Sequence, residues 1–438
     1  MAARFGGVAL GLLTVFTAAP AQAQPQGQPT EPQVQPGDGS YFRRDRNMSV
    51  KDRQRQRDDG LGWRMGSFRL KPEIAVAAGY NDNIAATETD EQEGMVYQGD
   101  VRLDLKSDWG RHELNAGLYV PTVNYVSAWT ATDAVLHVDG RYDVDRGLSI
   151  IGGVLYGERH EPYSYLPDGV QLEEPIAYHD GRAHIGFVQT LNRVRLAARA
   201  DYAVYDYEDG ELTSGLPYET DDRDLTETGF SVRADYAMSE LVSFFVTASS
   251  NDRDHKLDVP DVSVNEDSNG YEVLGGVNFD ITRLMRGEVA VGYFSQSFDD
   301  PALNETTGAA AQALVEWYPD ELVTITVGAQ RRVENAPVEE VSTPGAATYV
   351  GNDLSVAADY EFRRNVILGL TTRYSLDEYD QIDREDHRLN AYATVDYEVN
   401  RNTLLTLRVG HETQESEGVD QGRNYDANFA TIGVRLRR

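Results

Sequence analysis

The chain contains no cysteine and no long apolar run, and its basic residues are far outnumbered by acidic ones. The absence of cysteine excludes disulfides, thiolate metal sites and cysteine nucleophiles. No apolar stretch approaches the roughly 18 residues of a membrane-spanning helix. Membrane-spanning β-strands are still possible, because their sequences show only a weak alternation of apolar and polar residues. With 40 Lys and Arg against 72 Asp and Glu, the net charge of −32 argues against a nucleic-acid partner.

What the sequence does contain is a repeated hairpin pattern. In residues Leu389–Gly410, apolar and polar residues alternate on both sides of the turn Asn400–Asn402. Alternation with a period of two predicts a strand with one apolar and one polar face, and two such strands around a tight turn predict a hairpin. Related units recur along the chain at a spacing of roughly 40 residues.

The pattern predicts an all-β protein, a transmembrane antiparallel β-barrel of about 18 strands. Short turns such as Asp145–Gly147 alternate with long polar loops such as Gly210–Asp224, as in barrels with periplasmic turns and extracellular loops. A β-propeller, the alternative, would need four-stranded blades and tight loops at both ends. The strands are expected to begin near Phe68, Met95, His112, Val135, Leu148, Ile176, Val194, Leu225, Leu241, Gly270, Gly287, Ala309, Leu322, Tyr349, Val366, Arg388, Leu404 and Tyr425.

The first part of the chain differs in composition from this pattern. Residues 1–23 read as a signal peptide, because an apolar core at Val8–Ala19 precedes the cleavage-site pattern Ala21–Ala23. Residues 24–66 are expected to form a disordered basic periplasmic tail, in which Ser49 caps a short helix. The alternative for this basic segment is that it docks on an acidic barrel mouth or on a periplasmic partner. Residues 67–438 are expected to form the barrel.

Strand parity assigns charged residues to an inner face. Inward acids near the short turns are expected to form a carboxylate ring that favours cations at the periplasmic mouth. These acids are Asp104, Asp143, Asp235, Asp280, Asp359, Glu361, Asp396 and Glu398. The inward basic residues are Arg102, Arg141, Arg199, Arg233 and Arg408. The alternative is that Arg–Asp ladders merely stiffen the wall of a water-filled lumen.

Parity also assigns aromatic residues to the outer face, each two to five residues before a short turn. A constant distance from the turns predicts one level in the membrane, as in an aromatic girdle at the periplasmic interface. These residues are Tyr142, Tyr236, Phe279, Trp317, Tyr360 and Tyr397. The expected surroundings are outer-membrane lipid and lipopolysaccharide.

No catalytic or metal-binding pattern is evident. The eight His are dispersed, and no G-x-S-x-G nucleophile motif occurs, so neither an enzyme nor a cofactor is expected. Acidic loop residues such as Glu88, Asp90 and Glu91 suit divalent ions shared with lipopolysaccharide, or simply a solvated loop.

The segment Gly66–Ile84 resembles the opening of the outer-membrane barrel family "Putative beta-barrel porin 2", through Gly66–Phe68, Pro72 and Gly79–Asn83. The resemblance implies an outer-membrane channel associated with exopolysaccharide export, working with periplasmic export proteins.

Three functions are compatible with these features. The first is a passive conduit for a secreted polysaccharide, with the inward rings of Tyr205 and Tyr392 available to stack on sugars. The second is a general cation-selective diffusion porin, narrowed by the long loop Gly210–Asp224 or His255–Asn269 folding inward. The third is a structural or adhesive surface barrel with a plugged lumen. The solute, the direction of transport and the oligomeric state are open at this level.

Overall fold

The computed structural model describes residues 48–58, 62–126, 128–161, 170, 172–220, 223–256, 265–281, 284–335 and 348–438. The expected signal peptide and residues 24–47 of the expected tail lie outside the described residues. No helix in the described part of the chain is long and apolar enough to span a bilayer.

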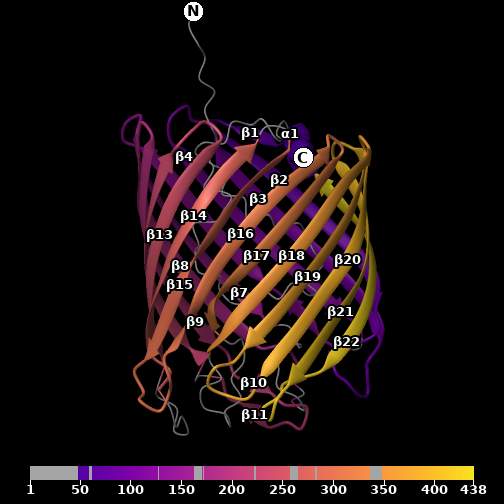
Figure 1. Ribbon diagram of the computed structural model, residues 1–438. Helices are drawn as coiled ribbons and strands as arrows, with labels where there is room; N and C mark the ends of the chain where they lie inside the picture. The colour runs from indigo at the N-terminus through magenta and orange to yellow at the C-terminus, as the bar shows by residue number, and fades with distance from the viewer. Residues whose placement is uncertain are drawn as a thin grey trace, which may run out of the picture.

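The described chain folds into a closed antiparallel β-barrel whose strands are strongly tilted (Figure 1). Its 20-stranded sheet includes the three-residue strands β1 (Trp63–Met65) and β5 (Thr130–Thr132), so 18 long strands form the wall. The wall strands are β2 (Phe68–Asn81), β3 (Gly94–Ser107), β4 (Glu113–Tyr125), β6 (Ala134–Asp143), β7 (Leu148–His160), β8 (Ala177–Leu191), β9 (Val194–Tyr207), β12 (Leu225–Ala237), β13 (Val242–His255), β14 (Ser268–Ile281), β15 (Met285–Phe298), β16 (Thr306–Asp320), β17 (Val323–Asn335), β18 (Thr348–Arg363), β19 (Val366–Glu378), β20 (Glu385–Asn400), β21 (Thr403–Glu417) and β22 (Tyr425–Arg437).

The first and last wall strands close the barrel by pairing with each other. Antiparallel register runs from Glu73 opposite Arg437 to Asn81 opposite Phe429. Neighbouring strands along the chain pair throughout, which confirms the predicted fold class and its 18 strands. Each strand begins within a few residues of its expected start, because the alternation and the turn residues together specify the register of a hairpin.

The two ends of the barrel differ as expected. One end carries the short turns, for example residues 192–193 and 401–402, together with the C-terminus and β1. The other end carries the long connections, including the small hairpin of β10 (Gly210–Glu211) and β11 (Pro217–Tyr218), which the alternation did not predict. We call these the turn end and the loop end, and Figure 1 shows the turn end uppermost.

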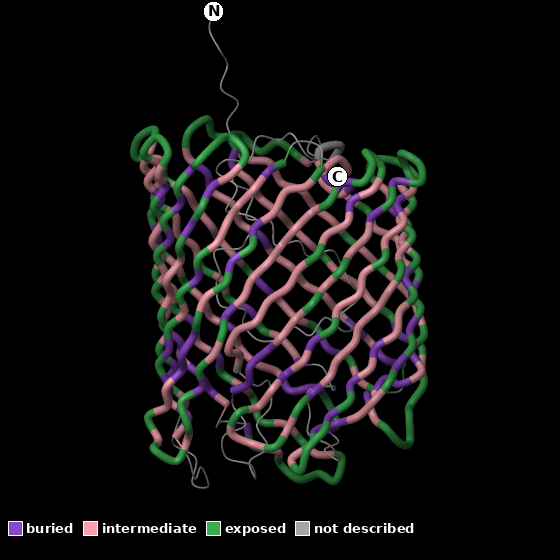
Figure 2. Tube along the Cα trace, in the orientation of Figure 1, coloured by how far each residue is buried: buried purple, intermediate pink, exposed green. Residues whose placement is uncertain are grey.

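Exposure alternates along the strands, because successive side chains point to opposite faces of the wall (Figure 2). Outward residues are largely apolar and exposed, with Val246 at 55%, Ile185 at 63% and Val291 at 66%. Such an outer face suits lipid, where apolar side chains are favoured and charges are costly. An exception near the loop end is outward Arg331, whose Nη1 lies 2.7 Å from Glu378 Oε2.

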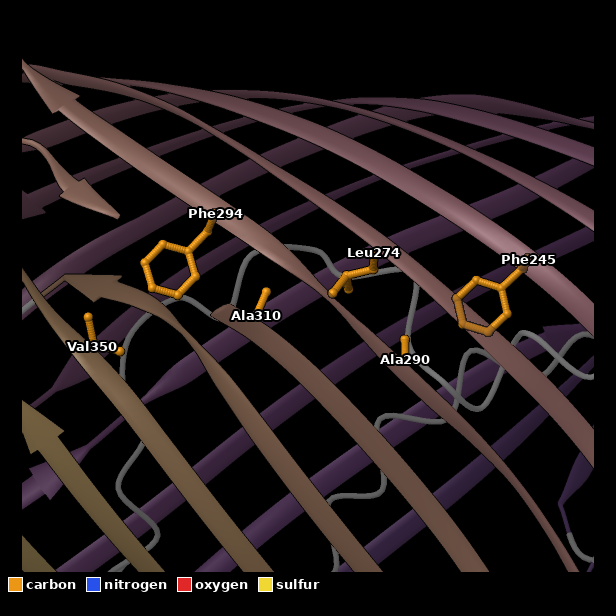
Figure 3. Close-up of a cluster of buried hydrophobic side chains, with 6 residues drawn as sticks. All are labelled: Phe245, Leu274, Ala290, Phe294, Ala310 and Val350. Atoms are coloured by element: carbon orange, nitrogen blue, oxygen red, sulfur yellow. The ribbon is translucent and has the colours of Figure 1, made fainter. Parts of the chain in front are cut away.

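The inner wall is less uniformly charged than the sequence predicts. An apolar cluster extends over β13 to β18 and consists of Phe245, Leu274, Ala290, Phe294, Ala310 and Val350 (Figure 3). Gly276 makes room for it, because a Cβ there would lie 2.4 Å from the Phe245 ring. The predicted polar lining is therefore interrupted by an apolar stripe on one side of the barrel.

The chain before the barrel also has defined structure. Strand β1 folds back on β2, pairing Trp63 with Leu70 around a turn in which Gly66 takes a positive φ of 63°. Helix α1 (Val50–Asp58) precedes it, and Ser49 caps this helix by accepting a 3.0 Å hydrogen bond from the Asp52 amide. The predicted cap is confirmed, whereas the expected disorder of residues 24–66 is wrong for residues 48–58 and 62–66.

Candidate functional site in the barrel lumen

Arginine and aspartate occur two positions apart on several inner strand faces. A period of two places both side chains on one face, and arginine is long enough to bend along its strand and reach the carboxylate. The clearest case is Arg233, whose Nη2 donates to Asp235 Oδ1 at 2.9 Å and to Glu288 Oε2 at 2.7 Å. The Arg233 side chain is only 3% exposed, so this is a buried, doubly paired guanidinium.

The same ladder includes other predicted lumen residues. Arg141 pairs with Asp143 at 3.0 Å, and Arg199 pairs with Asp201 at 2.6 Å. Arg182 pairs with Asp180 at 2.6 Å in the reverse order along the strand. Much of the charge on β6, β8, β9 and β12 is therefore compensated by ion pairs. These ion pairs also hold the paired side chains in place.

The predicted acids on β18 have different partners, because they bind helix α1. Lys51 Nζ lies 3.0 Å from Asp359 Oδ1, and Arg53 Nη2 lies 3.0 Å from Glu361 Oε2. Both carboxylates are buried, with side chains 8% and 9% exposed. The structure thus brings together the acidic mouth and the basic segment that the sequence offered as its docking partner.

Two further contacts complete the seat of α1 on the inner wall. The buried Val50 amide donates to Thr324 Oγ1 on β17 at 3.0 Å. Asp52 Oδ2 accepts from Arg286 Nη2 on β15 at 2.8 Å, and Arg286 also pairs with Glu316 on β16. We call Thr324, Asp359, Glu361 and Arg286 the α1 seat.

The remaining predicted acids occupy inner positions close to the same turn end. Asp396 accepts a 2.7 Å hydrogen bond from the Thr406 hydroxyl, a neutral donor. Glu398 lies 3.8 Å from Arg437 Nη2. Asp280 is buried near the end of β14, and Asp104 is half-buried near the end of β3.

The remaining predicted basic residues face aromatic rings. The Arg408 guanidinium lies 3.7 Å from the Tyr392 ring centroid and 5.3 Å from that of Phe429. Arg102 lies 4.7 Å from the Tyr119 ring centroid. Cations are attracted to ring faces, so these rings hold the arginines against the wall.

The six predicted girdle aromatics lie on the outer face near the turn end. Tyr142 is 58% exposed and Trp317 is 45% exposed. Five of the rings stand opposite the first residue of a neighbouring strand; these are Tyr236 opposite Val194, Phe279 opposite Val242, Trp317 opposite Met285, Tyr360 opposite Val323 and Tyr397 opposite Val366. This register places them at a similar level, and their contact with interfacial lipid stays a prediction.

At the loop end, Arg423 joins three loops. Its Nη1 donates to the Ala85 carbonyl at 2.8 Å, in the β2–β3 loop, and its Nη2 donates to the Val170 carbonyl at 3.0 Å, in the β7–β8 loop. Arg423 itself belongs to the β21–β22 loop and is 3% exposed. In the closed sheet, β7 and β22 are separated by β2, β3, β4 and β6, so this contact brings the β7–β8 loop to a distant part of the rim.

A buried ion pair holds the base of the β7–β8 loop. Arg223 Nη2 lies 2.5 Å from Glu161 Oε1, and its guanidinium lies 4.0 Å from the Tyr207 ring centroid. Burial raises the pKa of Glu161, and the Arg223 charge opposes that rise. Buried arginines therefore connect loops from distant parts of the loop-end rim.

The Gly210–Asp224 loop takes part in these contacts through Arg223, which binds Glu161. The Gly210–Asp224 loop packs its Leu212 and Tyr218 against Leu172 and Ile176, which extends the inward β7–β8 loop. Residues 257–264 of the His255–Asn269 loop lie outside the described residues. Arg423 and Arg223 are not among the site residues predicted from the sequence, although an arginine within an acidic loop is a usable signal.

The fold and the lumen define a class. The barrel is closed, has 18 strands, is apolar outside and charged inside, and has fixed loops at one mouth. This architecture is typical of a porin-like channel of the outer membrane. The chain belongs to the family described as "Putative beta-barrel porin 2", whose model matches residues 59–438. It is accordingly an outer-membrane protein, and the resemblance noted at Gly66–Ile84 is confirmed.

Comparison with solved structures returns other outer-membrane proteins. OpdK from Pseudomonas aeruginosa is 11% identical with a TM-score of 0.44, covering 84% of this chain and 99% of that chain. The FrpB iron transporter from Neisseria meningitidis is 7% identical with a TM-score of 0.46, covering 84% and 82%. A BenF-like porin from Pseudomonas fluorescens is 10% identical with a TM-score of 0.43, covering 84% and 99%. No curated protein matches the chain.

Proposed function

We propose that this channel conducts small solutes passively and prefers cations, with transport rather than catalysis as its function. The observation that carries the proposal is at the turn end, where Asp359 and Glu361 each hold a cationic side chain, Lys51 and Arg53. These carboxylates therefore form a cation-binding surface, and further acids lie on inner positions nearby. Acids that line a mouth raise the local concentration of cations.

The arginine ladder does not oppose this preference. Arg141, Arg199 and Arg233 each have a carboxylate within 3.0 Å, so their positive charge is largely compensated locally. Asp396, by contrast, has the neutral Thr406 hydroxyl as its hydrogen-bond donor. The preference for cations therefore rests on the acids of the mouth, of which Asp359 and Glu361 already bind the cationic groups of α1.

The polysaccharide conduit receives less support from the lumen. The rings of Tyr205 and Tyr392, offered as stacking platforms for sugars, each face a guanidinium: Arg182 at 5.6 Å and Arg408 at 3.7 Å from the ring centroid. The arginine covers one face of each ring and so leaves less aromatic surface for a sugar. Adding oligosaccharides to an open channel in a bilayer tests this candidate directly, because a sugar that enters the lumen lowers the current.

The test of cation preference is the reversal potential of the refolded protein in a planar bilayer under a KCl gradient. We expect a cation-selective value that moves toward zero in the triple variant Asp143→Asn, Asp280→Asn, Asp396→Asn, whose three acids lie outside the α1 seat. The matched control removes three outward carboxylates, Glu415→Gln, Glu417→Gln and Asp426→Asn, and leaves the value unchanged. An anion-selective or indifferent channel would refute the proposal, and a channel that never conducts would favour the structural or adhesive function.

A further inference from the structure

Helix α1 starts on one part of the turn-end rim, and the next described element, β1, lies on another. Its start is held on β17, where Val50 is 1% exposed and its amide bonds to Thr324. After the helix, Trp63 pairs with Leu70 on β2. Five wall strands, β18 to β22, separate β17 from β2 in the sheet. Helix α1 and strand β1 thus lie at two distant positions of the mouth, at the end that Figure 1 shows uppermost.

The contacts of α1 alternate in charge and so define one register. Lys51 meets Asp359, Asp52 meets Arg286, and Arg53 meets Glu361, at 3.0, 2.8 and 3.0 Å. A shift of one residue along the helix would place like charges together on this seat. The match of three consecutive residues to three wall charges indicates a specific binding site rather than an incidental contact.

These contacts give α1 little hydrophobic stabilisation. Apart from Val50, the helix VKDRQRQRD has no apolar residue, so it buries almost no hydrophobic surface. A nine-residue helix is too short to persist in water without a partner, so its order depends on the seat. Partly exposed ion pairs are individually weak and are screened by salt, and the Lys51 side chain is 38% exposed.

We propose that α1 is a removable plug of this channel, with Thr324, Arg286, Asp359 and Glu361 as its binding site. The seated helix narrows the mouth and neutralises two carboxylates. Release widens the mouth and exposes Asp359 and Glu361 to cations in the lumen, so conductance and cation preference rise together. This inference builds on the proposed channel function and adds the group that controls it.

Charge reversal tests the seat by single-channel recording. The variant Lys51→Glu, Arg53→Glu sets acids against Asp359 and Glu361, and we expect a several-fold larger mean conductance than in the native chain. Adding Asp359→Lys and Glu361→Lys restores both pairs with inverted signs, and the native conductance is expected to return. A double variant that conducts as the native chain does, or a quadruple variant that stays open, would overturn the plug.

A tether tests removability in the intact protein. Because the chain has no cysteine, the pair Val50→Cys, Thr324→Cys introduces only one possible disulfide. We expect the oxidised channel to stay at its lowest conductance and a reducing agent to restore native opening. The conductance of each single-cysteine variant is expected to be the same with and without the reductant. Equal currents before and after reduction of a verified disulfide would contradict the proposal.

The two proposals fail separately. Cation preference is measured on Asp143, Asp280 and Asp396, which lie outside the seat, whereas plugging is measured on conductance after changes in the seat. A channel without ion preference that still opens when the tether is reduced would refute the proposed selectivity alone. A cation-selective channel that ignores both the tether and the charge reversals would refute the plug alone.

Discussion

Arg423 and Val170 meet over the loop end of the barrel, where the Arg423 Nη2 donates to the Val170 carbonyl at 3.0 Å. The same guanidinium reaches the Ala85 carbonyl with Nη1 at 2.8 Å. One side chain therefore joins two other loops through their backbone carbonyls. Together with α1 at the opposite end, this gives the channel a chain segment attached to the wall or rim near each mouth.

Removing this guanidinium is expected to widen the loop end. In Arg423→Ala the β7–β8 loop loses its attachment to the far rim, and we expect a larger single-channel conductance and faster proteolytic cleavage within residues 161–176. Arg423→Lys is the informative control, because one ammonium group cannot reach two separated carbonyls in the way that a planar guanidinium does. A lysine variant identical to the native channel would show that charge, and not the bridging geometry, holds the loops.

A buried arginine in the ladder is expected to matter far more for stability than an exposed one. Arg233→Ala leaves Asp235 and Glu288 buried without the guanidinium between them, a change that typically costs about 3–5 kcal/mol. The fall in the free energy of unfolding is measurable by urea titration of the barrel in lipid vesicles.

The matched control is Arg64→Ala, which breaks the Arg64–Asp108 pair at the turn end. That pair has a similar separation, 3.0 Å, but its side chains are 72% and 47% exposed. Exposed pairs contribute roughly 0–1 kcal/mol, so this variant is expected to unfold almost as the native chain does. Equal losses in the two variants would mean that burial of the ladder contributes nothing.

The β6–β7 turn is expected to respond to acid. The amides of Gly147 and Leu148 donate to Asp145 Oδ1 at 2.7 and 2.9 Å, and these bonds hold the pKa of Asp145 below its ordinary value. A depressed pKa means that ionised Asp145 stabilises the fold above the pKa of the unfolded chain, near 3.9, and that this contribution is lost as the pH falls through the lower folded value. Carboxyl NMR titration in micelles checks this, and a folded pKa at or above that of an unstructured aspartate would contradict it.

The fold could be predicted because its information is local. In a hairpin such as β20–β21, the alternation of Val395, Tyr397 and Val399 sets the face, and Asn400–Asn402 sets the turn. Their even or odd position along the strand then assigned Asp143, Asp235 and Arg233 to the inner face of the barrel wall, and the structure places them on that face.

The partners of these groups could not be predicted, because they depend on closure of the barrel. Arg53 and Glu361 are 308 positions apart, and Arg423 and Val170 are 253 positions apart. Nothing in the local pattern says which basic residue of the segment before the barrel meets which inner acid. The apolar stripe through Phe245 and Phe294 could not be predicted for a related reason, since no strand contributes more than two of its residues.

The position of the aromatic girdle yields the last prediction, and the four tryptophans of the chain make it testable. Trp317 points outward near the turn end and is 45% exposed. Trp129, in contrast, packs inside the loop end, with its ring 4.4 Å from that of Tyr125, and joins a buried cluster with Ile84 and Val96. Tryptophans at a membrane interface lie at the level of the lipid headgroups.

Two single-tryptophan variants, with the other three tryptophans replaced by phenylalanine, separate these positions by fluorescence in vesicles of brominated lipid. We expect the fluorescence of Trp317 to be quenched, most strongly by bromine on the acyl-chain carbons nearest the headgroup, because its ring contacts lipid close to the headgroups. Trp129 is expected to resist every brominated lipid, since the wall lies between it and the bilayer. Quenching of Trp317 that peaks with bromine at the acyl-chain end would place the ring near the bilayer centre and contradict the girdle, and quenching of Trp129 would contradict its inward position.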